Sequence, residues 1–312
     1  MQYLYTFGFD PGDEALCRLE MRCFFGMESA PGQNYVVSDV AVEPSRSPFI
    51  RERVNVVCAA QSLEELLAFV ANYSVENRSF KIVCINGKVI GPEPKMGHVK
   101  RQQLEIAVGE PIEGEVDLHE PDVELAVAKV GELYYFGELV HGEAVWRRHI
   151  ERPVPYSTAL STKHARALVN ITAPILDNVR LIDPCCGVGT VVIEALSMGA
   201  NIIGRDMNWF VASGSRSNIE HFGYKGTIEL GPIEEITDTF DAAIIDMPYN
   251  LFTHSSEVDR QSIIHSARGI AKRVVFVSSE DLTQLIQEQQ FTITDFCTIQ
   301  KQQFVRNVYV CK

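Results

Sequence analysis

The sequence lacks the features that mark several protein classes. Its eight cysteines form no Cys-x-x-Cys pair and no cluster with histidine at zinc spacing, so neither a disulfide framework nor a metal site is indicated. No stretch approaches the roughly 18 uncharged apolar residues of a membrane span. The first residues contain no basic segment followed by an apolar one, as a secretory signal would. We therefore expect a cytoplasmic protein with reduced thiols and no metal.

An excess of positive charge is also absent, because 28 Lys+Arg stand against 41 Asp+Glu and give a net charge of −13 at pH 7. Binding of nucleic-acid phosphates depends on clustered lysine and arginine. Residues 105–143 are strongly acidic. Basic residues still gather locally, at Arg78, Lys81, Lys88, Lys95, Lys100 and Arg101, and again at Arg147, Arg148 and Arg152. The charge pattern alone is equally consistent with a solvated acidic surface that carries scattered basic residues.

The chain is long enough for two domains, with 312 residues of which 46% are hydrophobic. Its pattern changes near residue 150. Over 1–150 we expect an α+β domain, because short apolar runs separated by glycine and proline are typical of strands. The expected strands lie at 79–87, 103–108, 123–130 and 132–140, with a helix at 62–74.

Over 151–312 strands alternate with helical patterns, which predicts an α/β domain with a doubly wound, mostly parallel, seven-stranded sheet. Helices are expected at 161–172, 190–199, 208–223, about 256–268 and 280–289, the first with Ser161 or Thr162 as its N-cap. Strands are expected at 179–184, 201–207, 226–230, 241–246, 273–279, 291–300 and 304–312. The last two are too close in sequence for a crossover helix, so they must pair antiparallel.

Acidic residues end three of these strands. In such a sheet, ligands bind beyond the carboxyl ends of the strands, where Asp183, Asp206 and Asp246 would meet. Gly187 and Gly189 in the turn after the first strand would let the backbone approach a ligand closely. Asp206 follows Gly187 at the distance at which an acid takes the hydroxyl pair of a ribose. The pattern therefore predicts an adenosine-containing cofactor.

The glycine turn does not match a dinucleotide site. It has no third glycine, and the acid-proline pair Asp183 and Pro184 precedes it. A carboxylate there would repel a pyrophosphate but suits a ligand with an ammonium group, such as S-adenosylmethionine. A nicotinamide-dependent dehydrogenase is therefore the least favoured enzyme class.

The stretch DMPY, at 246–249, indicates what the second substrate is. An exocyclic amine of a nucleobase is a poor nucleophile, so its methylation requires acceptors that hold the N–H groups and orient the lone pair. Asp246 and the carbonyl of Pro248 supply two acceptors, and Tyr249 can stack on a base that has left its stack. The alternative is that Asp246 caps the next helix and Tyr249 packs in the core.

Two motifs carry a resemblance to a known family. DPCCGVGT at 183–190 and DMPY resemble the DPxCGxGT and (D/N)xPY motifs of class I S-adenosylmethionine-dependent amino-methyltransferases. The runs RPVPYSTALSTKHARALVNI, EALSMGANIIGRDMN and NIEHFG are similar to tRNA guanosine-N2-methyltransferases that carry an N-terminal THUMP RNA-binding domain. Residues 115–140 look like the final part of such a THUMP module.

The resemblance implies a role for each motif residue. Asp206 would hold the ribose of S-adenosylmethionine and Met207 would pack on its adenine, while Asp246, Pro248 and Tyr249 would form the base site. The methionine side of the cofactor would be lined by Asp183, Pro184, Cys185, Gly187, Gly189 and Thr190. RNA, in particular tRNA, is the expected partner; a protein partner and the oligomeric state are left open.

The sequence departs from the family pattern after the third strand of this domain. The usual Gly-Asp-Ala, whose acid receives the adenine amine, is replaced by Gly231, Pro232 and Ile233. That hydrogen bond is missing unless Glu234 or Glu235 substitutes for it. Three hypotheses remain open: methylation of guanine N2 in RNA; the same chemistry on adenine N6 of DNA or on a glutamine amide of a protein; and a non-catalytic, cofactor-binding partner protein.

The remaining residues of interest are expected to be structural. His221 and His265 lie on predicted helices and are read as surface or core histidines. Cys185 and Cys186 have no basic partner nearby in the sequence that would activate a thiolate. Trp146 is read as an interdomain packing residue, with stacking on RNA as the alternative.

Overall fold

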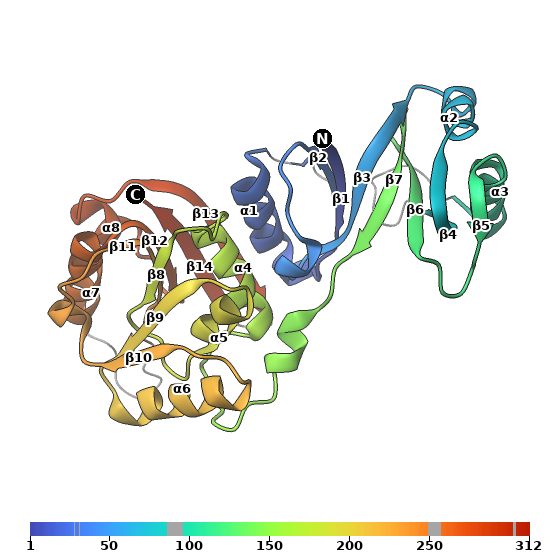
Figure 1. The fold of residues 1–312 in the computed structure, drawn as a ribbon. Coiled ribbons are helices and arrows are strands. Elements are labelled where there is room, and N and C mark those ends of the chain that lie inside the picture. The colour runs from blue at the N-terminus through green and yellow to red at the C-terminus, as the bar shows by residue number, and fades with distance from the viewer. Residues whose placement is uncertain (28, 31, 86–95, 249–256, 302–303) are drawn as a thin grey trace. The chain divides into compact units, whose positions relative to one another are not determined.

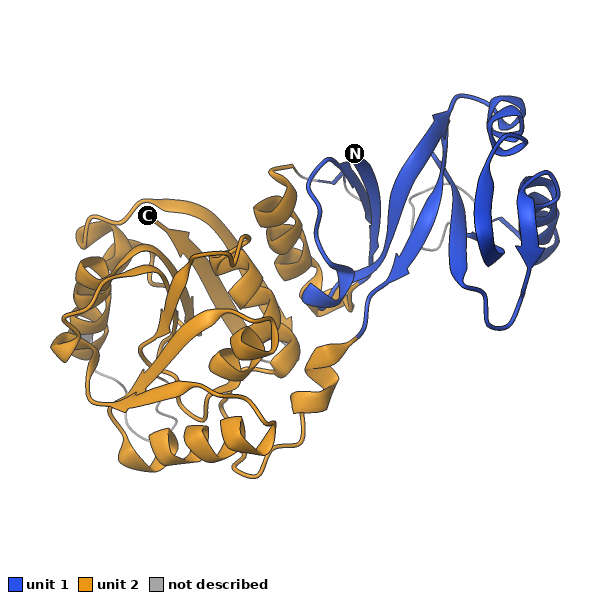
Figure 2. Ribbon diagram, viewed as in Figure 1, with its two compact units in different colours: residues 1–8, 28–143 blue, residues 9–27, 144–312 orange. Residues whose placement is uncertain are grey.

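The structure is a computed structural model that describes every residue except 28, 31, 86–95, 249–256 and 302–303. It divides into two compact units, one of residues 1–8 and 28–143 and the other of residues 9–27 and 144–312 (Figure 2). The sequence predicts a single boundary at residue 150. The structure differs because residues 9–27 belong to the second unit.

The first unit is built on a seven-stranded sheet in the order β2-β1-β3-β7-β6-β4-β5 (Figure 1). Strand β4 runs parallel to β5 and β6, and the other pairs are antiparallel. Its elements are β1 (Gln2–Phe7), β2 (Tyr35–Ser38), η2 (Pro44–Arg46), β3 (Ile50–Ala60), α2 (Leu63–Val70), β4 (Ser74–Cys84), α3 (His98–Gly109), β5 (Glu113–Val116), β6 (Val123–Val130) and β7 (Leu133–His141). One apolar cluster packs α2 and α3 on the sheet, and a second gathers side chains of β1, β3, β6 and β7.

Most of the elements expected in this unit are present. Helix α2 and strands β4, β6 and β7 confirm four of the predicted segments, although residues 86 and 87 of the first strand prediction lie outside the described residues. The strand predicted at 103–108 is wrong, because these residues lie within α3. Leu104 and Val108 are buried while Ile106 is 65% exposed, a spacing of four that fits one face of a helix.

A glycine in β7 allows two strands of the first unit to approach closely. A Cβ on Gly137 would lie 1.9 Å from the backbone oxygen of Asn55, beside the register shift between Val56 and Cys58 in β3. Because neither backbone can move without breaking the ladder, Gly137→Ala is expected to destabilise this unit by about 3 kcal/mol. Hydrogen exchange of the β3 and β7 amides measures the effect.

The matched control makes the same change at an open position. Gly269→Ala, on the exposed side of a helix in the second unit, adds a Cβ that meets no atom within 4 Å. It is expected to leave exchange in β3 and β7 unchanged and to stabilise its own helix by about 0.5–1 kcal/mol. Equal exchange in Gly137→Ala and the parent chain would show that the strands can separate without cost.

The second unit also contains a seven-stranded sheet, in the order β10-β9-β8-β11-β12-β14-β13. Its elements are η1 (Pro11–Asp13), α1 (Glu14–Phe25), η3 (Val145–His149), α4 (Thr162–Thr172), β8 (Arg180–Asp183), α5 (Thr190–Ser197), β9 (Asn201–Asp206), α6 (Trp209–His221), β10 (Thr227–Leu230), η4 (Ile233–Glu235), β11 (Phe240–Asp246), α7 (Glu257–Ile270), β12 (Ala271–Ser278), α8 (Thr283–Glu288), β13 (Ile293–Lys301) and β14 (Phe304–Cys311). Helices α4 and α5 lie on one face of the sheet, and α7 and α8 lie on the other (Figure 1).

This sheet confirms the predicted fold class. Strands β8 to β12 are parallel to one another. Strand β14 is antiparallel to both β12 and β13, and its pairing with β13 is the one that the short link between the last two strands requires. Ser161 is the N-cap of α4, because its hydroxyl accepts a hydrogen bond from the backbone N–H of His164 at 3.2 Å. None of the helices within the described residues has the length and apolar content needed to span a membrane.

Helix α1 is the element of this unit that the sequence analysis did not identify. It packs on α4 and β13. The carboxylate of Glu20, which is fully buried, accepts a hydrogen bond from Nδ2 of Asn170 at 2.7 Å. Arg22 forms a two-bond ion pair with Asp295, each bond 2.9 Å long. These long-range polar contacts explain why the segment belongs to the second unit.

The carboxylate of Asp13 links the residue before α1 to α4 by hydrogen bonds. It accepts hydrogen bonds from Nζ of Lys163 at 2.6 Å and from Nε2 of His164 at 2.8 Å. Burial alone would raise the pKa of Asp13, but the hydrogen bonds and charges of His164 and Lys163 outweigh it and lower the pKa from 3.8 to about 2. The ionised carboxylate therefore stabilises the folded state.

Asp13→Asn is expected to cost about 2 kcal/mol of folding free energy at pH 7. Because the pKa of Asp13 is lowered in the folded state, the stabilisation by its carboxylate is fully present above the pKa of the unfolded state. It is lost as the pH falls through the pKa of the folded state. The stability difference between Asp13→Asn and the parent chain should therefore shrink between about pH 4 and pH 2. Urea unfolding followed by tryptophan emission measures it, because both tryptophans lie in the second unit.

Asp10→Asn is the matched control for this prediction. Its carboxylate also contacts Nζ of Lys163, at 3.0 Å, but its side chain is 84% exposed. A solvent-screened pair of this kind contributes about 0–1 kcal/mol. An equal loss in both variants would contradict the assignment of the stabilisation to the buried Asp13.

Candidate active site

Three carboxylates lie at one edge of the second sheet. Asp183, Asp206 and Asp246 are the last residues of β8, β9 and β11, which are neighbouring parallel strands. The carboxyl ends of parallel strands meet at the same edge. The predicted convergence of the three acids is therefore present in the structure.

The turn after β8 is shaped by its two glycines. Gly187 has φ 53° and Gly189 has φ 85°, a region that residues with a Cβ rarely adopt. A Cβ on Gly189 would also lie 2.3 Å from Oγ of Ser215 on α6. The turn thus brings bare backbone to the N-terminus of α5, where the free N–H groups of a helix are available to a ligand.

Asp206 connects the second strand of the site to this turn. Its carboxylate accepts hydrogen bonds from the backbone N–H of Gly187 at 2.9 Å and of Asn208 at 2.8 Å. Its side chain is only partly buried, and a carboxylate has more acceptor positions than these two bonds use, so it can accept further hydrogen bonds from a ligand. The acid and the glycine turn therefore form one structural element of the site.

Asp183 is the most buried of the three acids, with 2% of its surface exposed. Burial raises its pKa well above the usual value, and the nearby charges of Asp246 and Asp206 raise it further. The backbone N–H of Cys185, which donates to its carboxylate at 3.2 Å, acts in the opposite direction. Carboxylates that raise one another's pKa would be stabilised by a cationic group placed between them.

The other predicted cofactor residues surround the same turn. Pro184 and Thr190 are buried, and the hydroxyl of Thr190 accepts a hydrogen bond from Nη1 of Arg152 at 2.6 Å. Burial raises the pKa of the Cys185 thiol well above its usual value, and the surrounding acids raise it further, so this thiol is not an activated nucleophile. Met207, which is 75% exposed, lies directly after Asp206 with its side chain open to solvent.

The base-site residues are described only in part. The side chain of Met247 is buried and its N–H donates to the carbonyl of Val277 at 2.9 Å, which fixes the backbone where β11 ends. Pro248 is exposed at the end of this strand. Tyr249 lies outside the described residues.

Glu234 and Glu235 differ in their partners. Glu235 pairs with Nη2 of Arg205 at 3.3 Å. Glu234 accepts a hydrogen bond from Oγ of Ser262 at 2.5 Å, and its charge contributes to the raised pKa of Cys185 in the turn. We therefore take Glu234 as the candidate for the missing adenine acceptor.

Two residues support the turn although the sequence analysis did not assign them to the site. Arg152 contacts Thr190, and the fully buried side chain of Asn218 bonds the backbone of Val154 on one side and of Val188 on the other. Both residues link the segment before α4 to the turn, through contacts that span 30 residues or more. Sequence spacing holds no signal for such contacts, since they depend on how the chain returns to the sheet.

The histidines singled out from the sequence lie away from this edge. His265 contacts the side chain of Gln289 at 2.9 Å, and the ring of His221 packs edge-on against Phe222. Within the described residues, no group of three His, Cys, Asp or Glu side chains is placed to hold a metal ion.

Comparison with known proteins identifies the domain that carries this site. Residues 148–297, just under half of the chain, match the family of RMKL-like methyltransferase domains. The chain is similar to tRNA (guanine(10)-N2)-dimethyltransferases, with 32% identity over 104 residues to that of Methanothermobacter thermautotrophicus, covering 32% of this chain and 31% of the relative. The relative from Pyrococcus abyssi is 32% identical over 127 residues, covering 39% and 36%. The chain thus spans about a third of the length of these relatives.

Solved structures of low sequence identity align with nearly the whole chain. TrmN from Thermus thermophilus matches with a TM-score of 0.49 and 16% identity, covering 100% of this chain and 99% of TrmN. A predicted N6-adenine-specific DNA methylase from Listeria monocytogenes matches with a TM-score of 0.48 and 14% identity, covering 99% and 95%. The family match places the three acids and the glycine turn inside the matched segment. Residues 148–297 therefore form a methyltransferase domain that is similar to the RMKL-like family.

Proposed function

We propose that this protein transfers a methyl group from S-adenosylmethionine to the exocyclic N2 of a guanine in tRNA. The observation that carries the proposal is the convergence of Asp183, Asp206 and Asp246 around the glycine turn of a methyltransferase domain. The relatives named as tRNA (guanine(10)-N2)-dimethyltransferases support guanine N2 as the acceptor and tRNA as the substrate.

The chain's own residues fit the cofactor at each of its parts. The acidic surroundings of Asp183 suit the cationic amino group and sulfonium, and Asp206 beside Gly187 suits the two ribose hydroxyls. Met207 offers an exposed apolar surface to the adenine, and Glu234 an acceptor to its amine. The backbone around Pro184, Cys185, Gly189 and Thr190 completes the wall on the methionine side.

The cofactor would supply an electrophilic methyl group on sulfur, and the protein's task is to position the amine. In this proposal the carboxylate of Asp246 accepts one N–H of the guanine amine and the carbonyl of Pro248 accepts the other. Tyr249 would stack on the base. The nitrogen would take the methyl carbon as its bond to sulfur breaks, and the proton that the methylated amine loses would pass to the carboxylate of Asp246 and then to solvent. No covalent enzyme intermediate is needed.

The first unit would hold the RNA, as the likeness of its last strands to a THUMP module implies. In the structure these strands are β6 and β7. The RNA-binding role of this unit is part of the proposal.

Transfer of label from methyl-labelled S-adenosylmethionine into three acceptors tests the proposal. Unmodified tRNA transcript is expected to take up label, whereas double-stranded DNA and a cell-protein fraction are not. Label in DNA or protein alone would assign the same chemistry to adenine N6 or to a glutamine amide. Binding of the cofactor without transfer to any acceptor would favour the non-catalytic partner protein.

A further inference from the structure

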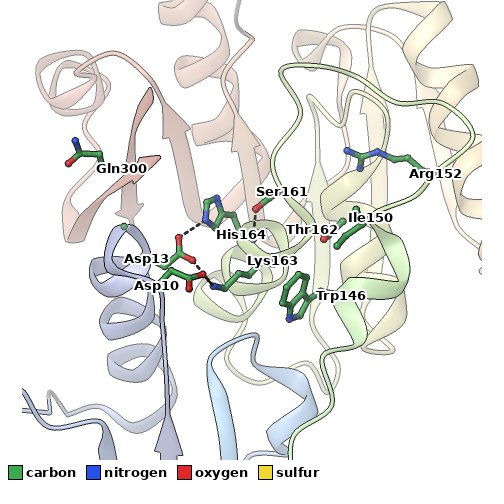
Figure 3. Close-up of a pocket in the computed structure, with 11 residues that line it drawn as sticks. Asp10, Asp13, Trp146, Ile150, Arg152, Ser161, Thr162, Lys163, His164 and Gln300 are labelled. Atoms are coloured by element: carbon green, nitrogen blue, oxygen red, sulfur yellow. Dashed lines mark hydrogen bonds and ion pairs between the residues drawn. The ribbon is translucent and has the colours of Figure 1, made fainter. Parts of the chain in front are cut away.

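A pocket lies in the second unit, outside the group formed by Asp183, Asp206 and Asp246. Its volume is about 540 Å³, within the roughly 300–1,000 Å³ of small-molecule sites. It is formed by η1, η3, the start of α4 and the end of β13. In Figure 3, Trp146, Ile150 and Thr162 lie on one side of Lys163, and Asp10, Asp13 and His164 on the other.

This pocket opens at the edge of the sheet that carries the acids. Strand β14 is antiparallel to β12, and β13 is antiparallel to β14, so β13 ends at the same edge as the parallel strands. Gln300, near the end of β13, lines the pocket. Arg152 also lines it and donates to the hydroxyl of Thr190, the first residue of the helix after the glycine turn. The pocket and the proposed methyl-transfer site are therefore neighbours.

The charges of the pocket lining nearly cancel. Arg152 and Lys163 are balanced by Asp10 and Asp13, and the latter two acids both contact Lys163. A phosphate, which requires an excess of cations, does not fit this balance. An uncharged, planar group does.

The apolar side of the pocket suits such a group. Trp146 is half-buried and Ile150 beside it is 56% exposed, so both offer apolar surface to the pocket. The guanidinium of Arg147 lies over the Trp146 ring, 5.4 Å from its centroid, and so places a positive charge beside this ring. Aromatic side chains of this kind stack on unpaired bases, and a cation at the rim suits the phosphate that follows.

The polar side offers a specific contact. His164 is 6% exposed, and its Nδ1 has no hydrogen-bond partner among the described residues. The carboxylate of Asp13 accepts from Nε2, so Nδ1 is the ring nitrogen that has no partner among the described residues. A buried polar atom without a hydrogen-bond partner is unfavourable, and a ligand that supplies one is favoured. The edge of a base or a ribose 2′-hydroxyl, each of which can donate or accept, would supply the missing partner.

We propose that this pocket binds a second nucleoside of the RNA substrate, unpaired and distinct from the one that is methylated. Trp146 stacks on its base, and Nδ1 of His164 forms a hydrogen bond with its base edge or ribose. The assignment rests on the proposed function, because it takes RNA as the substrate. The pocket is a second RNA-binding site, beside the site of methyl transfer. It holds the RNA next to the reacting guanine, and the cofactor does not occupy it.

The test uses Trp146 as its own reporter. The chain has two tryptophans, so Trp209→Phe leaves Trp146 as the only one, and Trp209 is 66% exposed. In this variant, unmodified tRNA transcript is expected to quench the emission of Trp146, whereas S-adenosylhomocysteine alone is not. Filter binding of the tRNA and methyl transfer are measured on the same preparation.

His164→Gln added to this variant tests the polar contact. The glutamine amide can still donate to Asp13, but it has no ring nitrogen at the place of Nδ1. It is expected to weaken the quenching affinity for tRNA about 10-fold, the equivalent of one hydrogen bond of about 1.4 kcal/mol. His221→Gln, an exposed histidine of α6, is the matched control and should change nothing.

Three results would overturn the proposal. If tRNA binds and is methylated while the emission of Trp146 is unchanged, the pocket holds no base and the proposed function stands. If S-adenosylhomocysteine alone quenches Trp146, the pocket belongs to the cofactor. If tRNA neither binds nor is methylated, the proposed function fails and the pocket assignment fails with it. Should His164→Gln not fold, the quenching experiment on Trp209→Phe decides by itself.

Discussion

Asp246→Ala is expected to lower kcat for methyl transfer about 10²–10³-fold while the affinity for S-adenosylmethionine changes little. The substitution removes the acceptor that would hold the guanine amine, and loss of one such oriented contact costs this much in other enzymes. Asp246 ends β11, next to the buried Met247, so its backbone is fixed by the sheet rather than by the substrate. The variant should therefore fold and bind the cofactor normally.

Asp241→Ala is the matched control, because it makes the same change at the opposite end of the same strand. The carboxylate of Asp241 accepts from the backbone N–H of Arg180 at 2.9 Å, at the amino edge of the sheet. The rate of methyl transfer by Asp241→Ala should stay within a few-fold of the rate of the parent chain. Single-turnover rates with saturating cofactor measure the effect on methyl transfer, and isothermal titration of S-adenosylhomocysteine measures the effect on cofactor binding. Similar rates for the two variants would remove Asp246 from the chemistry.

Glu194→Ala is expected to destabilise the second unit by about 3–5 kcal/mol. The carboxylate of Glu194 is fully buried and accepts from Nη1 of Arg166 at 2.9 Å, while its other oxygen lies 2.7 Å from Nδ1 of His149. The side chains of Arg166 and His149 are themselves 3% and 2% exposed. Removal of the acid takes this carboxylate away from the buried guanidinium and from the buried ring of His149, although the hydrogen bond from Arg166 to Ser197 remains.

Glu229→Ala is the matched control for this prediction. Its carboxylate contacts Nη1 of Arg205 at the same distance of 2.9 Å, but the side chain of Glu229 is 44% exposed. A solvent-screened pair contributes about 0–1 kcal/mol. Urea unfolding followed by tryptophan emission reports on the second unit in both variants. Equal midpoints for the two variants would show that burial does not raise the cost of losing this acid.

The second unit was predictable because its signals are local. Each strand of the parallel sheet is a short apolar run, and each of its ends carries a turn residue, a cap or an acid that the sequence displays. Ser161 as the N-cap of α4 and the antiparallel pairing of the last two strands followed from adjacent residues alone. The convergence of the three acids followed from one topological rule.

The errors came from segments whose surroundings are distant in sequence. The run at 103–108 contains alternating apolar residues, and only the burial of Leu104 and Val108 against the sheet shows that it is helical. Helix α1 joins the second unit through contacts such as Asp13 with His164, across 151 residues. The same distance hid the pocket at Trp146, since its lining comes from four separate segments.

Nucleoside analysis of tRNA that has been incubated with the protein and S-adenosylmethionine tests the central claim most directly. The account predicts N2-methylated guanosine as the new nucleoside, formed by the parent chain and by Asp241→Ala but about 10²–10³-fold more slowly by Asp246→Ala. Another methylated nucleoside in the tRNA, or none while methyl groups enter DNA or protein, would contradict it.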